Sequence, residues 1–282
     1  MATLPRDTGE VIRRALEEDL GPAGDVTSRA VVDGGAVARG RFEARADGVV
    51  AGLPVADRVF RAVDTDVEVS WRVADGDRVG PDDVLGELHG AARSILATER
   101  VALNFLTHLS GVATLTRRFV DACAGSASVV LCTRKTLPGL RSLERYAVEA
   151  GGGRLHRFGL SDGVLIKDNH VRLAGGVGEA VRRARAGVPH GLRVEVEVES
   201  LDQLEEAMEA GADAVLLDNG DLDTVKRAVD TVGDRIPLEI SGGVTLDRIA
   251  DIAGAGHLLI SVGRLTHSAP ALDISLELWP AP

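Results

Sequence analysis

Aromatic residues are scarce in this chain of 282 residues: they make up 3% of it, with two tryptophans and one tyrosine. Aliphatic side chains must therefore build the core. With 45% hydrophobic and 27% charged residues, the composition is ordinary for a globular protein. The length exceeds the usual size of a single core, which favours one large barrel or two domains.

Cysteine is nearly absent too. Cys123 and Cys132 form no CxxC pair and belong to no Cys/His cluster with zinc spacing, so we interpret them as buried thiols of a reducing compartment. No apolar run approaches the roughly 18 residues that a membrane span needs. The first residues lack the basic-then-apolar order of a signal peptide. We expect a cytoplasmic protein that has no membrane partner.

Positive charge is in the minority. Lysine and arginine number 32 against 43 aspartates and glutamates, which gives a net charge of −11. An acidic protein repels nucleic acid and anionic membranes at long range, so neither is an expected partner. An anionic substrate would need a local concentration of cations against this background.

The hydrophobic pattern changes along the chain. A helical pattern over 91–109 ends at Ser110-Gly111, which we predict to be a hinge after a β-rich first region. Beyond it, β-branched or leucine-rich runs alternate with helical stretches. The runs are 129–132, 163–166, 194–198, 214–217, 238–240 and 258–262. This alternation predicts a parallel sheet, and the lack of a doubly wound glycine fingerprint favours a β/α barrel.

Carboxylates end two of these runs. In a β/α barrel the chemistry lies at the carboxyl ends of the strands. Within 194–198 the valines face one way and the glutamates the other, and inward carboxylates need partners such as lysine, Mg²⁺ or ribose hydroxyls. Glu197 lies nearer the strand end than Glu195, and Asp218 would stand beside it. The alternative is an edge strand with a solvated glutamate face.

Glycines and cations end the other runs. Ser241, Gly242 and Gly243 follow the fifth run and Gly263 the sixth, where barrels commonly hold a phosphate, although the glycines could merely make tight turns. The cations are Arg134, Lys135, His156, Arg157 and Lys167. A solvated basic face is the ordinary explanation, but cations at one barrel mouth favour a polyanionic substrate, since arginine matches carboxylate and phosphate.

These motifs, in this order, resemble the quinolinate phosphoribosyltransferase family. The motifs are 133–136, 156–157 with 160–162, 166–170, 195–198, 217–219, 241–243 and 262–268, together with 24–28 and 99–104. The resemblance covers nearly the whole chain, and the ordered series is specific although each motif is weak alone. Arg264 departs from the smaller residue that the family often carries there.

The resemblance implies an architecture and an assembly. We expect an N-terminal α/β sandwich domain over 1–112 and an incomplete, TIM-like β/α barrel over 113–267, with the tail 268–282 packed back on the first domain. The family pattern also implies a homodimer, or a multiple of dimers, in which the helix with Glu99 and Arg100 reaches the partner's barrel.

The resemblance also implies an activity: conversion of quinolinate (pyridine-2,3-dicarboxylate) and 5-phosphoribosyl 1-pyrophosphate to nicotinate mononucleotide, pyrophosphate and CO₂ in NAD biosynthesis. The residues implied to hold the dicarboxylate are Arg100, Arg134, His156, Arg157 and Lys167. Those implied to hold the ribosyl donor are Lys135, Glu197, Asp218, Ser241, Gly242, Gly243 and Gly263. Lys135, Glu197 and Asp218 would be catalytic, and the two carboxylates would hold Mg²⁺, directly or through water.

Three alternatives remain open on the sequence. The nearest is a relative of the same fold that uses another base or accompanies molybdate transport. Another is a Schiff-base aldolase with Lys135 or Lys167 as the amine. The third is a biotinyl- or lipoyl-like carrier module over 67–88, but its hairpin tip lacks the lysine that a carrier needs.

Overall fold

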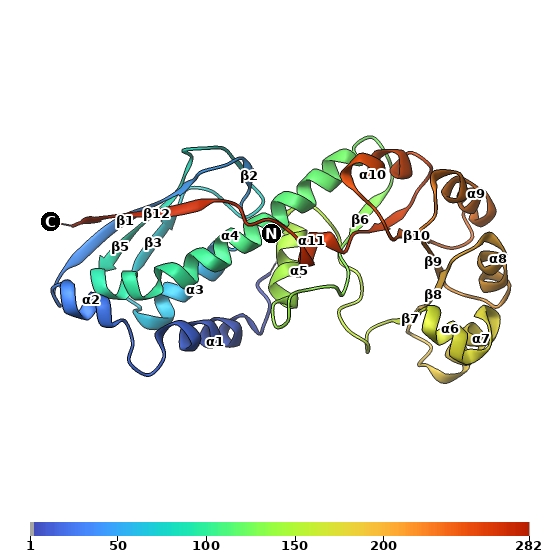
Figure 1. Cartoon of the computed structure of the whole chain (residues 1–282), viewed down its shortest axis with the longest axis horizontal. Helices are drawn as coiled ribbons and strands as arrows, with labels where there is room; N and C mark the ends of the chain where they lie inside the picture. The colour runs from blue at the N-terminus through green and yellow to red at the C-terminus, as the bar shows by residue number, and fades with distance from the viewer. Residues whose placement is uncertain (1–2, 282) are drawn as a thin grey trace. The chain divides into compact units, whose positions relative to one another are not determined.

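The computed structural model describes residues 3–281 (Figure 1). The chain forms two compact units. The first unit contains the chain up to Arg117, residues 136–152, and the chain from Arg264 onward; the second contains 118–135 and 153–263. Each unit is therefore built from separate stretches of sequence. The linear domains 1–112 and 113–267 stay a prediction.

The first unit contains a four-stranded antiparallel sheet in the order β12-β1-β5-β3, with α1, α3 and α4 along one face (Figure 1). Phe42 and Phe60 are fully buried and meet edge to face, with ring centroids 6.1 Å apart. The strands are β1 (Val37–Ala44), β2 (Gly48–Val49), β3 (Glu68–Trp71), β4 (Arg78–Val79), β5 (Val84–Ala91) and β12 (Ile274–Pro280). The helices are α1 (Thr8–Leu20), α2 (Val26–Val31), α3 (Leu53–Val63), α4 (Ala92–Ala122), α5 (Arg141–Ala150) and α11 (Arg264–His267).

The last strand completes this sheet. β12 pairs antiparallel with β1, in a register that runs from Ala38 opposite Pro280 to Ala44 opposite Ile274. The end of the described chain is thereby held to a strand near its beginning. The predicted β-rich first region is confirmed, and its sheet is antiparallel.

The predicted hinge at Ser110-Gly111 is wrong, because α4 runs unbroken from Ala92 to Ala122. Ser110 is buried and its hydroxyl bonds the backbone of Ala51. A Cβ at Gly111 would collide with the carbonyl oxygen of Pro270. The two small residues therefore allow close backbone approach within a helix, which a sequence pattern does not distinguish from a break.

The turn at Asp75 holds the beginning of α3 in place. Its carboxylate accepts hydrogen bonds from Gly52 N and Leu53 N, at 2.9 and 3.1 Å, where α3 begins. Tyr146 donates its hydroxyl to the same carboxylate at 2.5 Å. The feature that resembles a carrier hairpin is thus a helix cap within the first unit.

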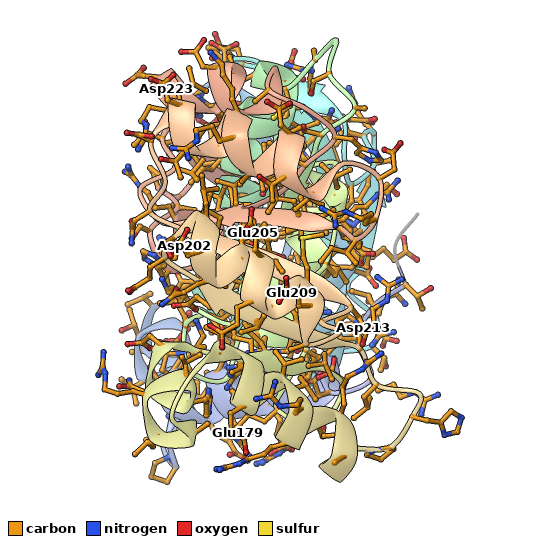
Figure 2. The ribbon with its side chains drawn as sticks, turned by 90° about the vertical axis from the view of Figure 1, so that its right-hand side faces the viewer. Glu179, Asp202, Glu205, Glu209, Asp213 and Asp223 are labelled. Carbon is orange, nitrogen blue, oxygen red and sulfur yellow. The ribbon has the colours of Figure 1, made fainter. Side chains whose placement is uncertain are left out.

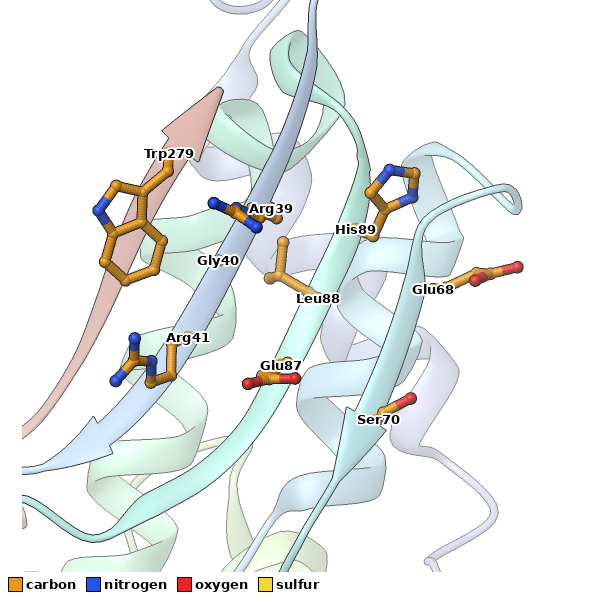
Figure 3. Close-up of a pocket in the computed structure, with 9 residues that line it drawn as sticks. All are labelled: Arg39, Gly40, Arg41, Glu68, Ser70, Glu87, Leu88, His89 and Trp279. Atoms are coloured by element: carbon orange, nitrogen blue, oxygen red, sulfur yellow. The ribbon is translucent and has the colours of Figure 1, made fainter. Parts of the chain in front are cut away.

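One face of the first sheet is open to solvent (Figure 3). We call it the open face, and its side chains are Arg39, Arg41, Glu68, Ser70, Glu87, His89 and Trp279. The Arg41 guanidinium lies over the Trp279 ring, 5.2 Å from its centroid. Arg72 pairs with Glu87 at 2.7 Å. Charges of both signs thus cover the side of the sheet that faces away from the core.

The second unit contains a six-stranded parallel sheet in the order β6-β11-β10-β9-β8-β7, with α6 to α10 on its outer side (Figure 1). The strands are β6 (Val129–Leu131), β7 (Val164–Ile166), β8 (Val194–Val198), β9 (Ala214–Asp218), β10 (Leu238–Ser241) and β11 (Leu259–Ser261). The helices are α6 (Asp168–Ala174), α7 (Val177–Gly187), α8 (Leu201–Glu209), α9 (Leu222–Val232) and α10 (Leu246–Ala253). β6 and β7 end the order and do not pair within residues 3–281. The predicted incomplete β/α barrel is confirmed.

Polar residues cap the helices that follow two of these strands. Ser200 Oγ accepts from Gln203 N at 3.2 Å where α8 begins, as its sequence position predicts. Asp221 does the same for Thr224 N at 2.8 Å before α9. The chain therefore turns sharply after each of these strands, and the residues between strand end and cap lie at one edge of the sheet. No helix within 3–281 is both long and apolar enough to cross a membrane.

Candidate active site

Carboxylates and lysines gather where β8 and β9 end. Lys167, which directly follows β7, donates its ammonium to Glu197 at 2.8 Å, and the Glu197 side chain is 11% exposed. Burial and the Glu197 charge raise the pKa of Asp218, whereas Lys167 and Lys135 act to lower it. Two carboxylates and two ammonium groups therefore share one electrostatic environment, as the strand ends predict.

Two arginines lie close to one another in the same unit. Burial first, and then the charge of Arg134, lower the pKa of the Arg157 guanidinium. Arg157 also donates to the carbonyl oxygen of Gly163 at 2.9 Å. The Nε of Arg134 is buried and has no hydrogen-bond partner within residues 3–281. A buried guanidinium N–H without a protein acceptor indicates a place for an anionic ligand. We call Arg134, Lys135, Arg157, Lys167, Glu197 and Asp218 the strand-end cluster.

The glycine-bearing loop after β10 packs against the loop after β9. Gly242 has a φ of +80°, and a Cβ there would collide with Oδ1 of Asn219 and lie 2.6 Å from Oδ1 of Asp218. Asn219 itself has a φ of +57°, and its N–H bonds the carbonyl oxygen of Ser241 at 2.9 Å. Only glycine allows this approach, and it leaves the loop backbone bare beside the carboxylates.

An arginine that the sequence did not single out joins these two loops. Arg248 of α10 donates to the carbonyl oxygens of Gly243 at 3.2 Å and Gly220 at 3.3 Å. Gly243 is also left-handed, with a φ of +60°. Gly263 lies just beyond the end of β11, as predicted. Arg100 lies exposed on α4 in the first unit.

His156 belongs to a buried network on the inner side of the sheet. Its Nε2 lies 3.4 Å from a Glu195 oxygen and 3.3 Å from a Glu239 oxygen. Ser261 donates its hydroxyl to the other Glu239 oxygen. The three ligand atoms of His156, Glu195 and Glu239 lie within 4.8 Å of one another, a spacing that a metal ion could also occupy. Sequence reasoning named Glu195 but overlooked Glu239; its only signal was a charged residue between Leu238 and Ile240 in a buried strand.

The network holds more protons than its separate parts would at neutral pH. Hydrogen bonds to Glu195 and Glu239 raise the pKa of His156 to about 9. Burial raises the pKa of Glu195, and the Glu239 charge adds to this effect. Because the N–H of Arg157 donates to Nδ1 of His156 at 2.7 Å, Nδ1 is bare and Nε2 carries the ring proton. The three side chains therefore share this proton, which belongs to the group rather than to one residue.

Acidic side chains also lie on the outer helices of this unit. Figure 2 shows acidic side chains on the outer helices α7 to α9 and beside them: Glu179, Asp202, Glu205, Glu209, Asp213 and Asp223. The strand-end cluster supplies four cations against two carboxylates. Glu195, Glu199 and Asp162 also act on these groups, so a net positive charge at the strand ends stays a prediction.

Comparison with known proteins gives a consistent result. Residues 112–277 match the family described as quinolinate phosphoribosyl transferase, C-terminal domain, and 25–110 match its N-terminal domain. The chain is 43% identical to the probable nicotinate-nucleotide pyrophosphorylase [carboxylating] of Bacillus subtilis, over 93% of this chain and 90% of that protein. It is 46% identical to the nicotinate-nucleotide pyrophosphorylase [carboxylating] of Mycobacterium leprae, over 97% and 96%. The crystal structure of NadC from Streptococcus pyogenes superposes with a TM-score of 0.95 at 40% identity, covering 100% of both chains.

Proposed function

Because the chain belongs to the quinolinate phosphoribosyltransferase family, we propose that its strand-end cluster is the active site for the reaction of that family. The chain is a decarboxylating glycosyltransferase that converts quinolinate and 5-phosphoribosyl 1-pyrophosphate to nicotinate mononucleotide in NAD biosynthesis. The observation that carries the proposed site is the position of Lys167, Glu197 and Asp218 at neighbouring strand ends, with Lys167 paired to Glu197 at 2.8 Å.

The dicarboxylate binds to the arginines in this proposal. Arg134 offers a buried Nε–H that has no protein acceptor within residues 3–281, and Arg157 lies beside it. A guanidinium can donate two parallel hydrogen bonds to one carboxylate. His156 contributes differently, because both of its ring nitrogens contact protein groups. It would face the substrate with its ring, not with an N–H.

The ribosyl donor binds along the glycine loop. Ser241, Gly242 and Gly243 present backbone N–H groups without side-chain obstruction, and Gly263 follows the neighbouring strand. Lys135 would neutralise the pyrophosphate as its charge grows. Arg248 joins this loop, at the carbonyl oxygen of Gly243, to the loop after β9, at that of Gly220, so the N–H groups keep their direction.

The two carboxylates of the strand-end cluster have the donor chemistry that a divalent cation prefers. Burial and the nearby charge of Glu197 raise the pKa of Asp218, and carboxylate oxygens are the donors that Mg²⁺ prefers. We propose that these two residues hold Mg²⁺, directly or through water. When bound, it would neutralise charge on the pyrophosphate.

Placement and fixed charge dominate the proposed chemistry. The quinolinate ring nitrogen attacks the anomeric carbon, the C–O bond to pyrophosphate breaks, and the pair of electrons leaves with pyrophosphate. Glu197 and Asp218 stabilise the positive charge that develops on the ribose ring. The alkylated ring nitrogen is cationic, so its charge stabilises the electron pair that stays on C2 when CO₂ departs, and a proton then binds to C2 in place of the carboxylate. The arginines meanwhile hold the ring in place.

We also propose a homodimer, or a multiple of dimers, in which exposed Arg100 reaches the strand-end cluster of a second copy. An Arg100→Ala variant and a Lys167→Ala variant would each be impaired. If each site takes residues from two copies, a mixture of the two variants that is allowed to exchange should recover about a quarter of the wild-type activity. No recovery in an exchanged mixture would overturn the shared site.

The decisive assay is release of labelled CO₂ from carboxyl-labelled quinolinate, with and without the ribosyl donor. We expect release only when both are present, and loss of release in Lys167→Ala. The matched control is Arg183→Ala, which removes a cation from the outer helix α7 and should leave release unchanged. Equal ribosylation of nicotinate would favour the relative with another base. A borohydride-trapped lysine adduct would favour the aldolase, although the ion pair of Lys167 argues for a charged amine.

A further inference from the structure

The segment 153–163 lies next to the strand where the second sheet stays open. Arg154 pairs with Leu131 of β6 as an isolated parallel bridge. Its N–H donates to Val130 O at 2.9 Å, and Cys132 N donates to its carbonyl oxygen at 3.1 Å. The rest of the segment up to Gly163 forms no helix or strand. Its backbone therefore needs another anchor if Arg157 is to keep a fixed position.

His156 supplies that anchor from within the segment. Its side chain is 10% exposed, and its Nδ1 accepts the backbone N–H of Arg157 at 2.7 Å. Its Nε2 points to Glu195 and Glu239. The imidazole thus connects the backbone of a substrate-binding residue to the interior of the sheet.

The groups behind His156 come from three strands. Glu195 lies on β8, Glu239 on β10 and Ser261 on β11, and Glu239 is 2% exposed. Ser261 donates to Glu239, which leaves the second Glu239 oxygen directed to His156. Strands are the rigid part of a barrel, so the orientation of the ring is fixed by the sheet and not by the loop that carries it.

We propose that Glu239, supported by Ser261, is a positioning residue that acts through His156 to hold Arg157 against the dicarboxylate. This proposal rests on the proposed function, since it assigns Arg157 to quinolinate. Glu239 itself touches no substrate. The network fixes one arginine of the strand-end cluster without being part of that cluster.

The test compares the Michaelis constants of the two substrates. Glu239→Ala removes the acceptor, so KM for quinolinate should rise about tenfold or more, as expected for a buried hydrogen bond to a charged group. KM for the ribosyl donor should stay within about twofold. Glu239→Gln keeps an acceptor of the same shape and should restore quinolinate KM to within about threefold of wild type. A uniform rise in both constants, or a Gln variant as poor as the Ala variant, would overturn the proposal.

A spectroscopic readout separates this inference from the proposed function. The Arg157 amide should show the shifted proton resonance and slow hydrogen exchange of a bonded N–H in wild type, and lose both in Glu239→Ala. This outcome does not depend on turnover. If the wild-type protein releases no CO₂ from quinolinate, only the proposed function is contradicted. If the Arg157 amide signal is unchanged in Glu239→Ala, the proposed role of Glu239 is contradicted.

Two further variants complete the design. Asp213→Ala is the matched control, because that carboxylate accepts from Val194 N at 2.8 Å and from Arg185 at 3.0 Å at the amino ends of the strands. It should leave both constants unchanged. If Glu239→Ala does not fold, Ser261→Ala removes only a hydroxyl and should raise quinolinate KM about threefold; no change there would contradict the proposal. A stoichiometric metal ion bound by wild type and lost from Glu239→Gln would also contradict it.

Discussion

The open face of the first sheet and the inner face of the second carry charged residues at the same two-residue spacing, yet they differ in kind. On the open face, Arg72 and Glu87 form an ion pair at 2.7 Å with side chains 57% and 53% exposed. On the inner face, Glu239 is 2% exposed and Glu197 11%. Water solvates the charges of the open face, so their ion pairs contribute little to the free energy of unfolding. Protein and ligand must satisfy the second set.

The contrast explains where a ligand site arises. An antiparallel sheet with helices on one side can leave charges on the other side at no cost, whereas a barrel covers both faces. Inward charges then need partners, and where protein supplies too few, as at Arg134 Nε, a ligand is the partner that remains. Alternating charge alone does not distinguish the two faces; the number of covered sides does.

The largest difference between the faces should appear in turnover. Glu197→Gln removes a carboxylate from the developing positive charge and should lower kcat about 100- to 1000-fold. Glu87→Gln, the same change on the open face, should leave kcat within about twofold. Steady-state kinetics with both substrates saturating measures this. Equal decreases of kcat in the two variants would contradict the proposed difference between the two faces.

The second difference should appear in stability against pH. The glutamates raise the pKa of His156 from 6.5 to about 9, so the folded protein binds this proton more tightly than the unfolded chain. The resulting stabilisation is complete below pH 6.5 and is lost as pH rises through about 9, with a size of about 3 kcal/mol. Denaturant unfolding from pH 6 to 10 should show this decline.

Two histidine variants sharpen that measurement. His156→Gln should flatten the decline in the free energy of unfolding, because the imidazole that shares the proton with Glu195 and Glu239 is gone. His89→Gln on the open face should keep the decline of wild type. A wild-type curve that is flat between pH 6.5 and 9 would refute the buried network's preference for the proton.

A smaller effect is expected for glycine. Gly242→Ala should raise KM for the ribosyl donor about tenfold, because the new Cβ displaces Asn219 and Asp218 in addition to straining a left-handed residue. Gly125 shares this conformation, with a φ of +88°, but a Cβ there would meet nothing within 4 Å. Gly125→Ala should therefore cost only about 1 kcal/mol of stability and no affinity. Similar KM values for the two variants would argue against a substrate at Gly242.

The smallest effect belongs to the open face. Arg72→Ala should change the free energy of unfolding by less than about 1 kcal/mol, and the change should shrink at about 1 M salt because exposed pairs are screened. Urea unfolding at low and high salt measures it. A loss of several kcal/mol that persists at high salt would mean that this face is covered in solution.

Local signals account for what the sequence predicted. Ser200 caps α8, and the valines of β8 are buried, because caps and alternation depend on neighbours in the chain. The strand-end cluster followed from a general property of parallel sheets. The neighbouring positions of Lys167, Glu197 and Asp218 could be predicted because chain order and sheet order coincide from β7 to β11.

Long-range packing accounts for what was missed. Gly111 is a residue type that often marks a hinge, but here it packs against Pro270, which is distant in sequence. Glu239 has no motif of its own, and its importance comes from His156 and Ser261 on other elements. Arg248 likewise joins two loops that only the folded sheet brings together. Such residues become visible only when the partner's position in space is known.

The most direct measurement is a crystal structure with quinolinate bound. We predict difference density for a planar diacid between Arg134 and Arg157, with a carboxylate on the buried Nε of Arg134 and the ring nitrogen directed to the side of Glu197 and Asp218. Density for quinolinate at any place away from these arginines, with the cluster unchanged, would contradict this assignment.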